Sequence, residues 1–553
     1  MSVKKTLTNN YTINYKSDVI PQYSKTDTSA TTTDFAVEVR RSGSDAGSTD
    51  QFGAATSICK RKSTAGSADS ETITLLAWSA PYWDGANEND LGAVYIVSSS
   101  AESSTGANGG TINRWGDDIH GNPALRLTTS LDTNPANGGS SASRNLGSAV
   151  HVWTTSYLEG RSNGLAVDCN IWDSSQTRYI HRVVAGASRH YDYPSSGGKN
   201  YIGAVHIWDF PAGTTQNHDV VEYVVTASTP TAGDEFGADV ATVSNEYGSY
   251  FFVSEIGRDM DGKNSMGVVH AYAFDKSTNP HLGVATINSP LSESSANWAT
   301  SLDADGTLLV GGMAGKNKVG IFKQTSSTNW IWVQTLTHPS GTTDAAGYRY
   351  GSNISISGDY LAVGAAQDHT TEGDANDPAG HVYIYKSGSS GFVLEDELYL
   401  TASGDTLTRG AKFGGAVSID AKSDGSKYIA VGAEKFGAFL DEPGWAQIFK
   451  SGSGGWTEHK LLRPHGTAGN KYENLGCSVS LTGGVALIGA HGDRLGDDNA
   501  GTKTGQVYIL DATTVTTSTT EDFGYPFRFG AKTVSNIRGI GAGTDIKIKT
   551  DDD

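Results

Sequence analysis

The chain contains little cysteine and no long hydrophobic run. Its three cysteines, Cys59, Cys169 and Cys477, lie far apart along 553 residues. An odd, scattered set fits neither a disulfide framework nor a metal cluster, so we expect three buried free thiols. No stretch approaches the roughly 20 apolar residues of a membrane-spanning helix, and the N-terminus lacks the apolar core of a secretory signal. The sequence therefore predicts a protein that is made in a cytoplasm and does not insert into a membrane.

Positive charge is also scarce. The chain has 41 Lys and Arg residues against 60 Asp and Glu residues, a net charge of −19. Such a field repels a phosphate backbone, which argues against nucleic acid as a partner. The sequence has no HExxH, Gly-x-Ser-x-Gly or P-loop motif, and His190 and His369 have no partners at metal-ligand spacing. We therefore expect no enzyme activity, no catalytic residue and no resident cofactor.

Glycine, in contrast, is abundant at 68 residues, and it recurs within a repeated pattern. The clearest copies are Tyr350–Lys386, Phe413–Lys450 and Leu475–Leu510. Each begins with a large residue and Gly, continues through two strands, a variable loop and a third strand, and is followed by a fourth strand in the first two. A period of roughly 50–70 residues made only of strands is typical of a propeller, because one unit cannot bury its own faces.

Weaker copies of this pattern determine the predicted number of blades. They begin at Phe52, Trp115, Asn163, Phe236 and Asn297. Their expected second strands are Leu75–Ala80, Leu125–Ser130, Val183–Ser188, Tyr250–Ile256 and Leu308–Met313. Their expected third strands are Ala93–Val97, Ala149–Trp153, Ala204–Trp208, Val268–Tyr272 and Lys318–Phe322. The sequence thus predicts an all-β, eight-bladed β-propeller of four-stranded antiparallel blades, with seven blades plus a degenerate unit as the alternative.

The ends of the chain complete the predicted organisation. The last repeat has no fourth strand of its own, and Phe35–Val39 is an isolated strand that we expect to complete it and close the ring. We predict a polar anchoring arm at 1–34, a propeller at 35–510 and a C-terminal tail at 511–553. Free polar termini are normally disordered, so tails held by neighbouring copies or partner proteins would make the protein a building block of an assembly.

These repeats resemble the FG-GAP repeat family, which includes the propeller of integrin alpha chains and many bacterial and viral adhesion proteins. Literal Phe-Gly occurs at Phe52-Gly53, Phe236-Gly237 and Phe413-Gly414. Gly-Ala ends the second strand in four copies, at Gly186-Ala187, Gly364-Ala365, Gly432-Ala433 and Gly489-Ala490. The resemblance covers about residues 52–510 and implies the propeller fold. It does not by itself imply a function.

The resemblance also raises the question of calcium. Many family members carry a D-x-D/N-x-D-G-x-x-D loop between the first two strands, which suits Ca²⁺. Here Asp420–Tyr428 reads DAKSDGSKY, with Lys422 and Tyr428 at ligand positions, and the loop at Asp303 lacks the final carboxylate. We interpret both as hairpin turns. Asp259, Asp261 and Asn264 are weaker candidates, without a distal bidentate Glu, so calcium is possible but not favoured.

Charged and aromatic residues gather in the variable loop between the second and third strands. Every blade of a propeller presents this loop on the same rim, and loops on a rigid scaffold commonly carry binding function. The predicted ligand-binding rim comprises Trp83, Asp84, His190, Tyr191, Asp192, Asp368, His369, Asp374, Asp493 and Asp497. Solvated turns have a similar composition, which is the alternative interpretation of most of these residues.

Together these features favour a non-enzymatic external component of a virus particle, such as a phage tail or capsid appendage. It would be made in the host cytoplasm, dock to other structural proteins through 1–34 and 511–553, and present its rim to a host-surface glycan or protein. The first alternative is a bacterial adhesin or lectin exported to the cell surface without a cleaved signal. The second is a glycan-cleaving enzyme with its site on the rim.

Overall fold

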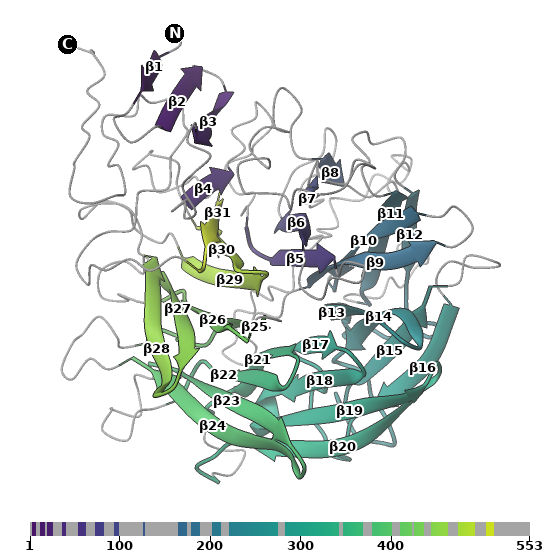
Figure 1. The fold of residues 1–553 in the computed structure, drawn as a ribbon. Helices are drawn as coiled ribbons and strands as arrows, with labels where there is room; N and C mark the ends of the chain where they lie inside the picture. The colour runs from purple at the N-terminus through teal and green to yellow at the C-terminus, as the bar shows by residue number, and fades with distance from the viewer. Residues whose placement is uncertain are drawn as a thin grey trace.

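The protein is seen here in a computed structural model, and its described residues are almost entirely β-strands (Figure 1). They comprise 3–6, 11–16, 19–25, 36–39, 53–61, 72–81, 93–98, 125–127, 164–173, 178–188, 202–211, 221–274, 282–341, 347–368, 379–400, 410–422, 425–435, 444–462, 474–492 and 505–513.

Within these residues the chain forms seven four-stranded antiparallel sheets, arranged as blades around a common axis. Blade 1 is β5 (Thr56–Arg61), β6 (Thr72–Ala80), β7 (Ala93–Ser98) and β8 (Leu125–Leu127). Blade 2 is β9 (Leu165–Asp173), β10 (Arg178–Ala187), β11 (Ala204–Pro211) and β12 (Val221–Val225). Blade 3 is β13 (Phe236–Asn245), β14 (Gly248–Glu255), β15 (Val268–Ala273) and β16 (Leu282–Asn288).

The remaining four blades follow the same order from inner to outer strand. Blade 4 is β17 (Leu302–Asp305), β18 (Leu308–Met313), β19 (Lys318–Ser326) and β20 (Asn329–Thr337), with the 3-10 helix η4 (Ala314–Lys316) between β18 and β19. Blade 5 is β21 (Tyr350–Ser357), β22 (Tyr360–Ala365), β23 (His381–Gly388) and β24 (Gly391–Tyr399). Blade 6 is β25 (Ala416–Ala421), β26 (Lys427–Ala433), β27 (Trp445–Gly452) and β28 (Gly455–Leu462). Blade 7 is β29 (Leu475–Thr482), β30 (Val485–Ala490), β31 (Gln506–Asp511) and β4 (Ala36–Val39).

The predicted count of eight blades is therefore wrong, and the alternative of seven is correct. The segment expected to be the second strand of an extra blade, Leu125–Ser130, contributes β8, which pairs with β7 as the outer strand of blade 1. A short apolar run looks the same in sequence whether it becomes a second or a fourth strand. The expected start of that blade at Trp115 and its third strand, Ala149–Trp153, lie outside the described residues.

The seventh blade is shared between the two ends of the chain. β4 lies antiparallel to β31, with Val39 opposite Val507 and Ala36 opposite Leu510. The strand predicted to close the ring thus lies at the position that closure requires. Without it β31 would be an open sheet edge, which natural proteins avoid.

Polar side chains join the inner strands of neighbouring blades around the axis. In most of these junctions a side-chain oxygen on one inner strand accepts a backbone N–H from the next, which satisfies both groups inside the core. The bonds of this kind are Asp239 with Leu302, Asp303 with Ile356, Asn353 with Val417, Ser355 with Ile419, and Ser418 with Leu481. Ser480 donates to the Thr56 carbonyl, and Ser244 donates to the Asp168 carboxylate.

The two glycines of the repeat meet at the interface between blades. The glycine that ends the second strand of one blade touches the glycine that opens the next blade. A Cβ added at Gly432 would lie 2.0 Å from the backbone oxygen of Gly476, and one at Gly489 would lie 2.0 Å from that of Gly53. Any larger residue would force the blades apart, so the repeated Phe-Gly and Gly-Ala pairs record the close packing of neighbouring blades.

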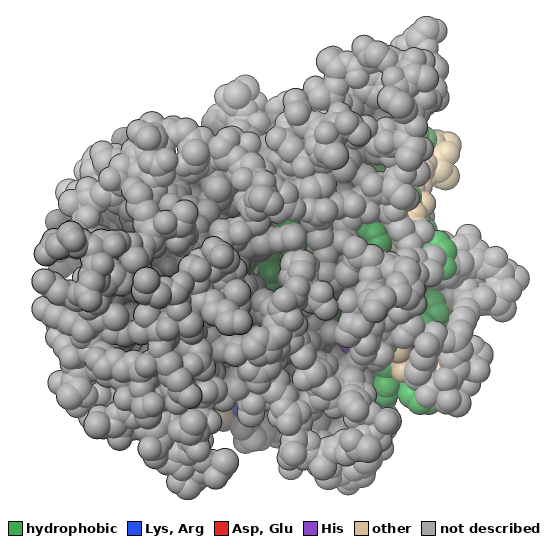
Figure 2. Space-filling model, turned by 90° about the horizontal axis from the view of Figure 1, so that it is seen from above, with side chains coloured by type: hydrophobic (Ala, Val, Ile, Leu, Met, Phe, Trp, Pro, Cys, Tyr) green, Lys and Arg blue, Asp and Glu red, His purple; other side chains and the backbone are tan. Residues whose placement is uncertain are grey.

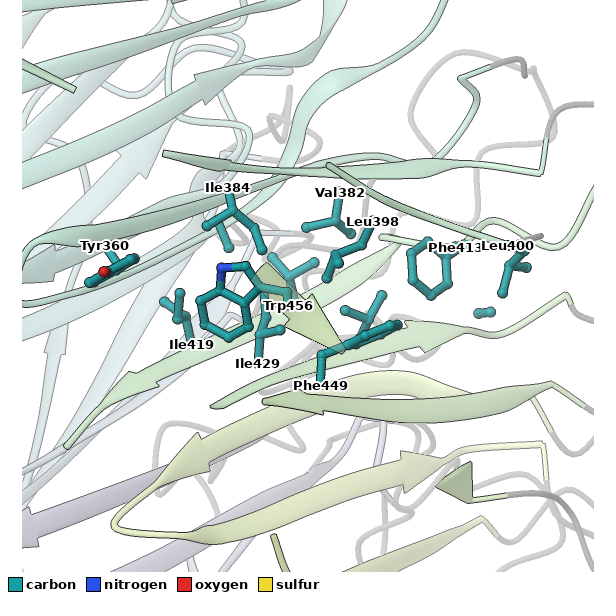
Figure 3. Packing of buried hydrophobic residues seen from close by; sticks show 14 of the residues in the cluster. Tyr360, Val382, Ile384, Leu398, Leu400, Phe413, Ile419, Ile429, Phe449 and Trp456 are labelled. Carbon is teal, nitrogen blue, oxygen red and sulfur yellow. The ribbon is translucent and has the colours of Figure 1, made fainter. Parts of the chain in front are cut away.

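Apolar side chains fill the rest of each interface between blades. Figure 3 shows one such cluster, in which residues of blade 5 such as Ile384 and Leu398 pack against Phe413, Ile429 and Trp456 of the blade 6 repeat. All five are buried. The hydrophobic core is therefore a series of layers between blades, so no blade is stable alone.

The cysteine prediction is wrong for two of the three residues. Cys59 on β5 and Cys169 on β9 form a disulfide, with Cα atoms 5.9 Å apart and 110 residues apart in sequence. The bond joins the inner strands of blades 1 and 2. Cys477 on β29 is a buried free thiol, as expected.

The N-terminal arm contains three strands. β1 (Val3–Thr6), β2 (Tyr11–Lys16) and β3 (Val19–Lys25) form an antiparallel sheet apart from the seven blades. Among the residues described, no helix has the length and apolar character needed to cross a membrane. Viewed from the end of the molecule that carries this sheet, the visible side chains of described residues are mostly hydrophobic (Figure 2).

Candidate functional site

The connections between the second and third strands of blades 3 and 6 are bonded, at their described bases, to segments that enter their own or the next blade. In blade 3, Arg258 Nη1 lies 3.1 Å from Asp234 Oδ2, and Asn297 Nδ2 donates to the Ile256 carbonyl. In blade 6, Lys412 Nζ lies 3.6 Å from Glu434 Oε1. Equivalent connections therefore leave the ring on the same side, and these contacts hold their bases in place.

The connection of blade 3, from Ile256 to Gly267, lies wholly within the described residues. Met260 and Lys263 exchange two backbone hydrogen bonds, and Asp259 Oδ1 accepts the Ser265 N–H at 2.8 Å. Asp261 has φ of 50°, a left-handed conformation in which Asp is tolerated. Asp259, Asp261 and Asn264 are all exposed, and in this turn Asp259 stabilises the backbone. Of the side chains described, no group of three or more His, Cys, Asp or Glu residues could hold a metal ion.

A buried acid lies beneath this connection. Glu255, at the end of β14, is 1% exposed, and its Oε2 is 2.7 Å from His270 Nε2. Arg258 Nη1 is 3.8 Å from Glu255 Oε1 and also donates to the Thr229 carbonyl. Burial raises the pKa of the neighbouring Asp234, and the charge of Glu255 adds to this effect. Arg258 therefore ties two carboxylates to the rim.

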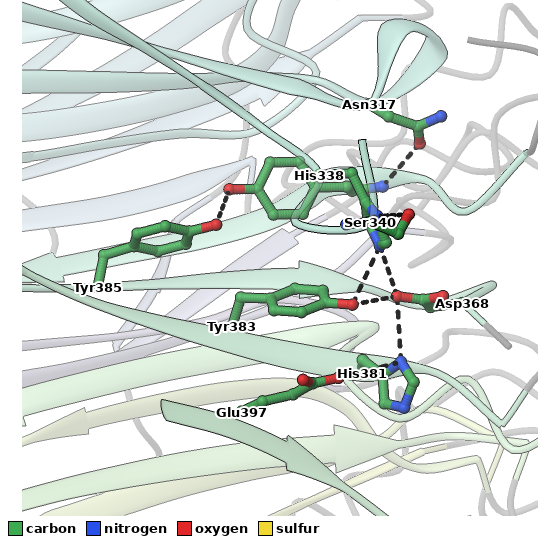
Figure 4. A network of polar contacts seen from close by, with 9 residues as sticks. Asn317, His338, Ser340, Asp368, His381, Tyr383, Tyr385 and Glu397 are labelled. Atoms are coloured by element: carbon green, nitrogen blue, oxygen red, sulfur yellow. Dashed lines mark hydrogen bonds and ion pairs between the residues drawn. The ribbon is translucent and has the colours of Figure 1, made fainter. Parts of the chain in front are cut away.

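The densest polar network lies at the rim of blade 5 (Figure 4). His338, just beyond β20, places Nε2 2.6 Å from Oδ2 of Asp368, which follows β22. Tyr383 on β23 donates its hydroxyl to the same oxygen at 2.5 Å, and His381 Nδ1 lies 3.1 Å from it. Three side chains from two segments thus converge on the carboxylate of Asp368, and all four residues are buried.

This network determines the ionisation of its members. Burial alone would raise the pKa of Asp368, but hydrogen bonds from His338, His381 and Tyr383 bring it well below its usual value. Burial, and then the hydrogen bond to Asp368, raises the pKa of Tyr383. Burial raises the pKa of Tyr385 to about 12; its hydroxyl accepts a hydrogen bond from Tyr350. Asp368 is therefore ionised and the tyrosines are neutral donors at neutral pH.

Ser340 extends the network to the surface. Its Oγ lies 2.7 Å from His338 Nδ1, while the ionised Asp368 accepts from Nε2 on the other side of the ring. Gly341 N–H bonds to the His338 carbonyl at 3.0 Å, which makes His338–Gly341 a tight turn. The contact with Ser340 is local to that turn, so the two contacts fix the orientation of the imidazole ring and tie the end of β20 to the segment after β22.

The structure locates one of the ten predicted rim residues. Asp368 lies at the predicted connection, where it is buried and bonded within the protein. Trp83, Asp84, His190, Tyr191, Asp192, His369, Asp374, Asp493 and Asp497 lie outside the described residues, so their role stays a prediction.

Sequence reasoning missed the partners of Asp368. His338 and Tyr383 lie 30 residues before and 15 residues after it, on different strands. No local motif links them, and only the blade register brings them together. The one available signal is that His381 and Tyr383 alternate along a strand next to an Asp-containing loop.

Comparisons with known proteins bear on the fold. Residues 333–385 and 456–510 match the model of the FG-GAP repeat. No match is found among curated proteins. Solved structures that match include a protein from Bacteroides uniformis, provisionally assigned as a 6-phosphogluconolactonase, which is 12% identical. That match covers 82% of this chain and 92% of the other with a TM-score of 0.37, too low to bear on fold or function.

The two FG-GAP matches begin in or at an outer strand and end at a third strand. The sequence repeat is therefore offset by one strand from the blade, which is why β4 precedes the first blade and closes the last. Together, the two matches and the ring of four-stranded blades support the FG-GAP repeat family for this chain.

Proposed function

We propose that this protein is a non-enzymatic binding and structural propeller, an external component of a virus particle such as a phage tail or capsid appendage. It docks to other structural proteins through residues 1–34 and 511–553 and presents its rim to a host-surface glycan or protein. A propeller with FG-GAP repeats suggests a binding or structural role. The observation that supports the proposal is the set of bonds that hold the bases of the second-to-third connections of blades 3 and 6 at equivalent places in their blades.

Two further observations support it. β4 and β31 lie in the same blade, so both tails leave the ring from one place, which suits attachment on one side. The disulfide between Cys59 and Cys169 suits a protein that works outside a reducing cytosol, because disulfides persist in oxidising surroundings. The second observation equally favours an adhesin on a bacterial surface, which is the second candidate.

Quantitative mass spectrometry of purified particles separates the two candidates. A virion component is present at a fixed ratio to the major capsid protein, and it is lost from particles when residues 1–34 are deleted. An adhesin is instead recovered with the cell-surface fraction. Absence from particles would overturn the virion assignment.

Binding of the full chain to host envelope preparations tests the role of the rim. A triple variant, His190→Ala, Tyr191→Ala and Asp192→Ala, should reduce binding at least about tenfold if the rim carries the contact. The matched control is Tyr247→Ala, because Tyr247 is exposed in the β13–β14 turn on the opposite rim. Equal loss in both variants would argue against the rim. Release of reducing ends from surface polysaccharide would instead indicate a glycan-cleaving enzyme.

A further inference from the structure

Exposed apolar side chains concentrate on two neighbouring outer strands. Among the residues described, eight large hydrophobic side chains are exposed, and six of them lie on β20 and β24. These six residues, here called the β20–β24 surface, are Ile331, Trp332, Val333, Val393, Leu394 and Tyr399. Consecutive strand residues face opposite sides of a sheet, so the six lie on both sides of these two outer strands. Exposed large apolar side chains in this number favour a partner that covers them.

The two strands are fixed side by side. Gln334 of β20 donates Nε2 to the Phe392 carbonyl at 2.9 Å and accepts the Phe392 N–H at 2.8 Å. Trp332, which is 57% exposed, is held by a bond from its Nε1 to Thr335 Oγ1 at 3.1 Å. The apolar surface is therefore preorganised, which reduces the entropy lost when a partner binds.

β20 is also an outer strand, and no strand of the described residues pairs with its outer edge. It is the last strand in the order of its sheet, and its nine residues, NWIWVQTLT, include no charge and no proline. The pairing of β20 with β19 shifts register at Val333 and again near the start of the strand. The strand carries no charge or proline to protect its outer edge, and an open edge accepts another strand. Next to it, β24 carries three consecutive acids, Glu395, Asp396 and Glu397. A partner that fits would add a strand to β20 and bring positive charge to β24.

The N-terminal sheet has these properties. Its strands contain Lys4, Lys5, Lys16 and Lys25 against a single acid, Asp18, between β2 and β3, in a chain whose net charge is −19. It has three strands, which is the lower limit for a sheet that is stable on its own, so packing against another surface would stabilise it. Its outer strands β1 and β3 each have a free edge within this sheet. In Figure 1 it lies at the opposite end of the molecule from β20 and β24, so a second copy must supply it.

We propose that the β1–β3 sheet of one copy docks on the β20–β24 surface of the next copy. One of its edge strands pairs with β20 and covers Trp332, and the lysine-rich sequence of the sheet complements the acidic sequence of β24. Donor and acceptor surfaces differ and lie at opposite ends, so the contact is heterologous and builds a row of copies. This inference rests on the proposed function, in which the tails dock within an assembly, and it names the partner as the protein itself.

Sedimentation velocity of the full chain over a concentration series tests the proposal. The wild type should form growing species, and Trp332→Ala should weaken association at least about tenfold, as expected at a central anchor. Trp172→Ala is the matched control, since Trp172 is 52% exposed on β9, away from this surface. Unchanged melting of both variants shows that folding is not the cause. A wild type that stays monomeric, or equal effects of both variants, would overturn the inference.

Charge reversal identifies the donor. Lys4→Glu with Lys5→Glu should abolish self-association, and so should Glu395→Lys with Glu397→Lys. A mixture of the two double variants should associate again, because the unmodified donor of one variant meets the unmodified acceptor of the other, and the reversed donor meets the reversed acceptor. Failure of that rescue would refute the assigned contact. The wild type could prove monomeric while the variant that lacks residues 1–34 is still lost from particles. In that case docking through the N-terminal tail stands, and its partner is a different protein.

Discussion

Removal of the disulfide between blades 1 and 2 is the sharpest test of the fold. The bond closes a loop of 110 residues in the unfolded chain. The chain-entropy relation for a loop of this size gives about 16 cal/mol/K, or about 4.8 kcal/mol at 25 °C. That is the largest effect expected, because a denatured chain with residual structure loses less entropy on cross-linking. Cys59→Ala with Cys169→Ala should therefore lower the free energy of unfolding by up to this amount.

The assay is urea unfolding followed by hydrogen exchange at β5 and β9, with and without reductant. Reductant should destabilise the wild type and leave the double variant unchanged. Cys477→Ala is the control: it removes a buried thiol and costs stability, but sensitivity to reductant should persist. If mass spectrometry finds free thiols at Cys59 and Cys169 in the oxidised wild type, or if reductant has no effect on exchange in either strand, the reasoning is refuted.

Three other predictions concern the axis, the blade interfaces and the closure. Burial raises the pKa of Asp303 to about 7. The protonated carboxyl therefore contributes about 4 kcal/mol to the free energy of unfolding below about pH 4, and this contribution is lost as pH rises through 7. In urea titrations, Asp303→Asn should show a flatter pH dependence of stability than the wild type, and an equal pH dependence would contradict this. In Gly432→Ala the new methyl group meets the Gly476 backbone and should lower the free energy of unfolding by about 1–3 kcal/mol or more. Gly454→Ala, with open space around it, should be near neutral. Equal melting temperatures of the two variants would refute the packing argument. Proline at both Val37 and Glu38 should open blade 7, because the N–H groups of adjacent strand residues point in opposite directions and one of the two faces β31. The result would be faster exchange in β29–β31 and not in blade 4.

Much of the fold could be predicted because close packing between blades restricts which residues the repeat can have at each position. The second strand Leu308–Met313 was predicted with the boundaries that β18 has, and Val268–Tyr272 differs from β15 by one residue. β18 is buried along five of its six residues, and its Gly312 meets the Gly351 backbone of the next blade. β15 follows Gly267, which packs against the Trp298 backbone. Close packing therefore restricts the residues at these positions to apolar side chains and glycine, and this pattern is visible in the sequence.

The number of blades and the disulfide were missed for one shared reason. Reading Leu125–Ser130 as a second strand inserted a blade between Cys59 and Cys169. In the ring of seven, those two cysteines lie on adjacent inner strands. Sequence separation gave no sign of this, because 110 residues is compatible with either arrangement. The correct topology was needed before the pair could be seen.

The candidate site could be predicted only at the level of the rim. Asp368 was identified as a loop acid, but its environment depends on His338 from the end of the preceding blade's outer strand. Exposure cannot be inferred from a polar residue in a variable loop when tertiary partners decide it. The same holds for Trp332, whose outward position follows from a register irregularity in β20 as well as from its sequence.

The shared seventh blade has a mechanical consequence. Any pull on the N-terminal sheet reaches the ring through β4, which is joined to β31 along four residue pairs. β4 therefore both connects the N-terminal sheet to the ring and closes the ring. A force strong enough to separate β4 from β31 would open blade 7 and expose the edge of β31, while the chain between the N-terminal sheet and the ring stays intact. The pairing of β4 with β31 therefore determines both how much force the N-terminal attachment withstands and whether the ring stays closed.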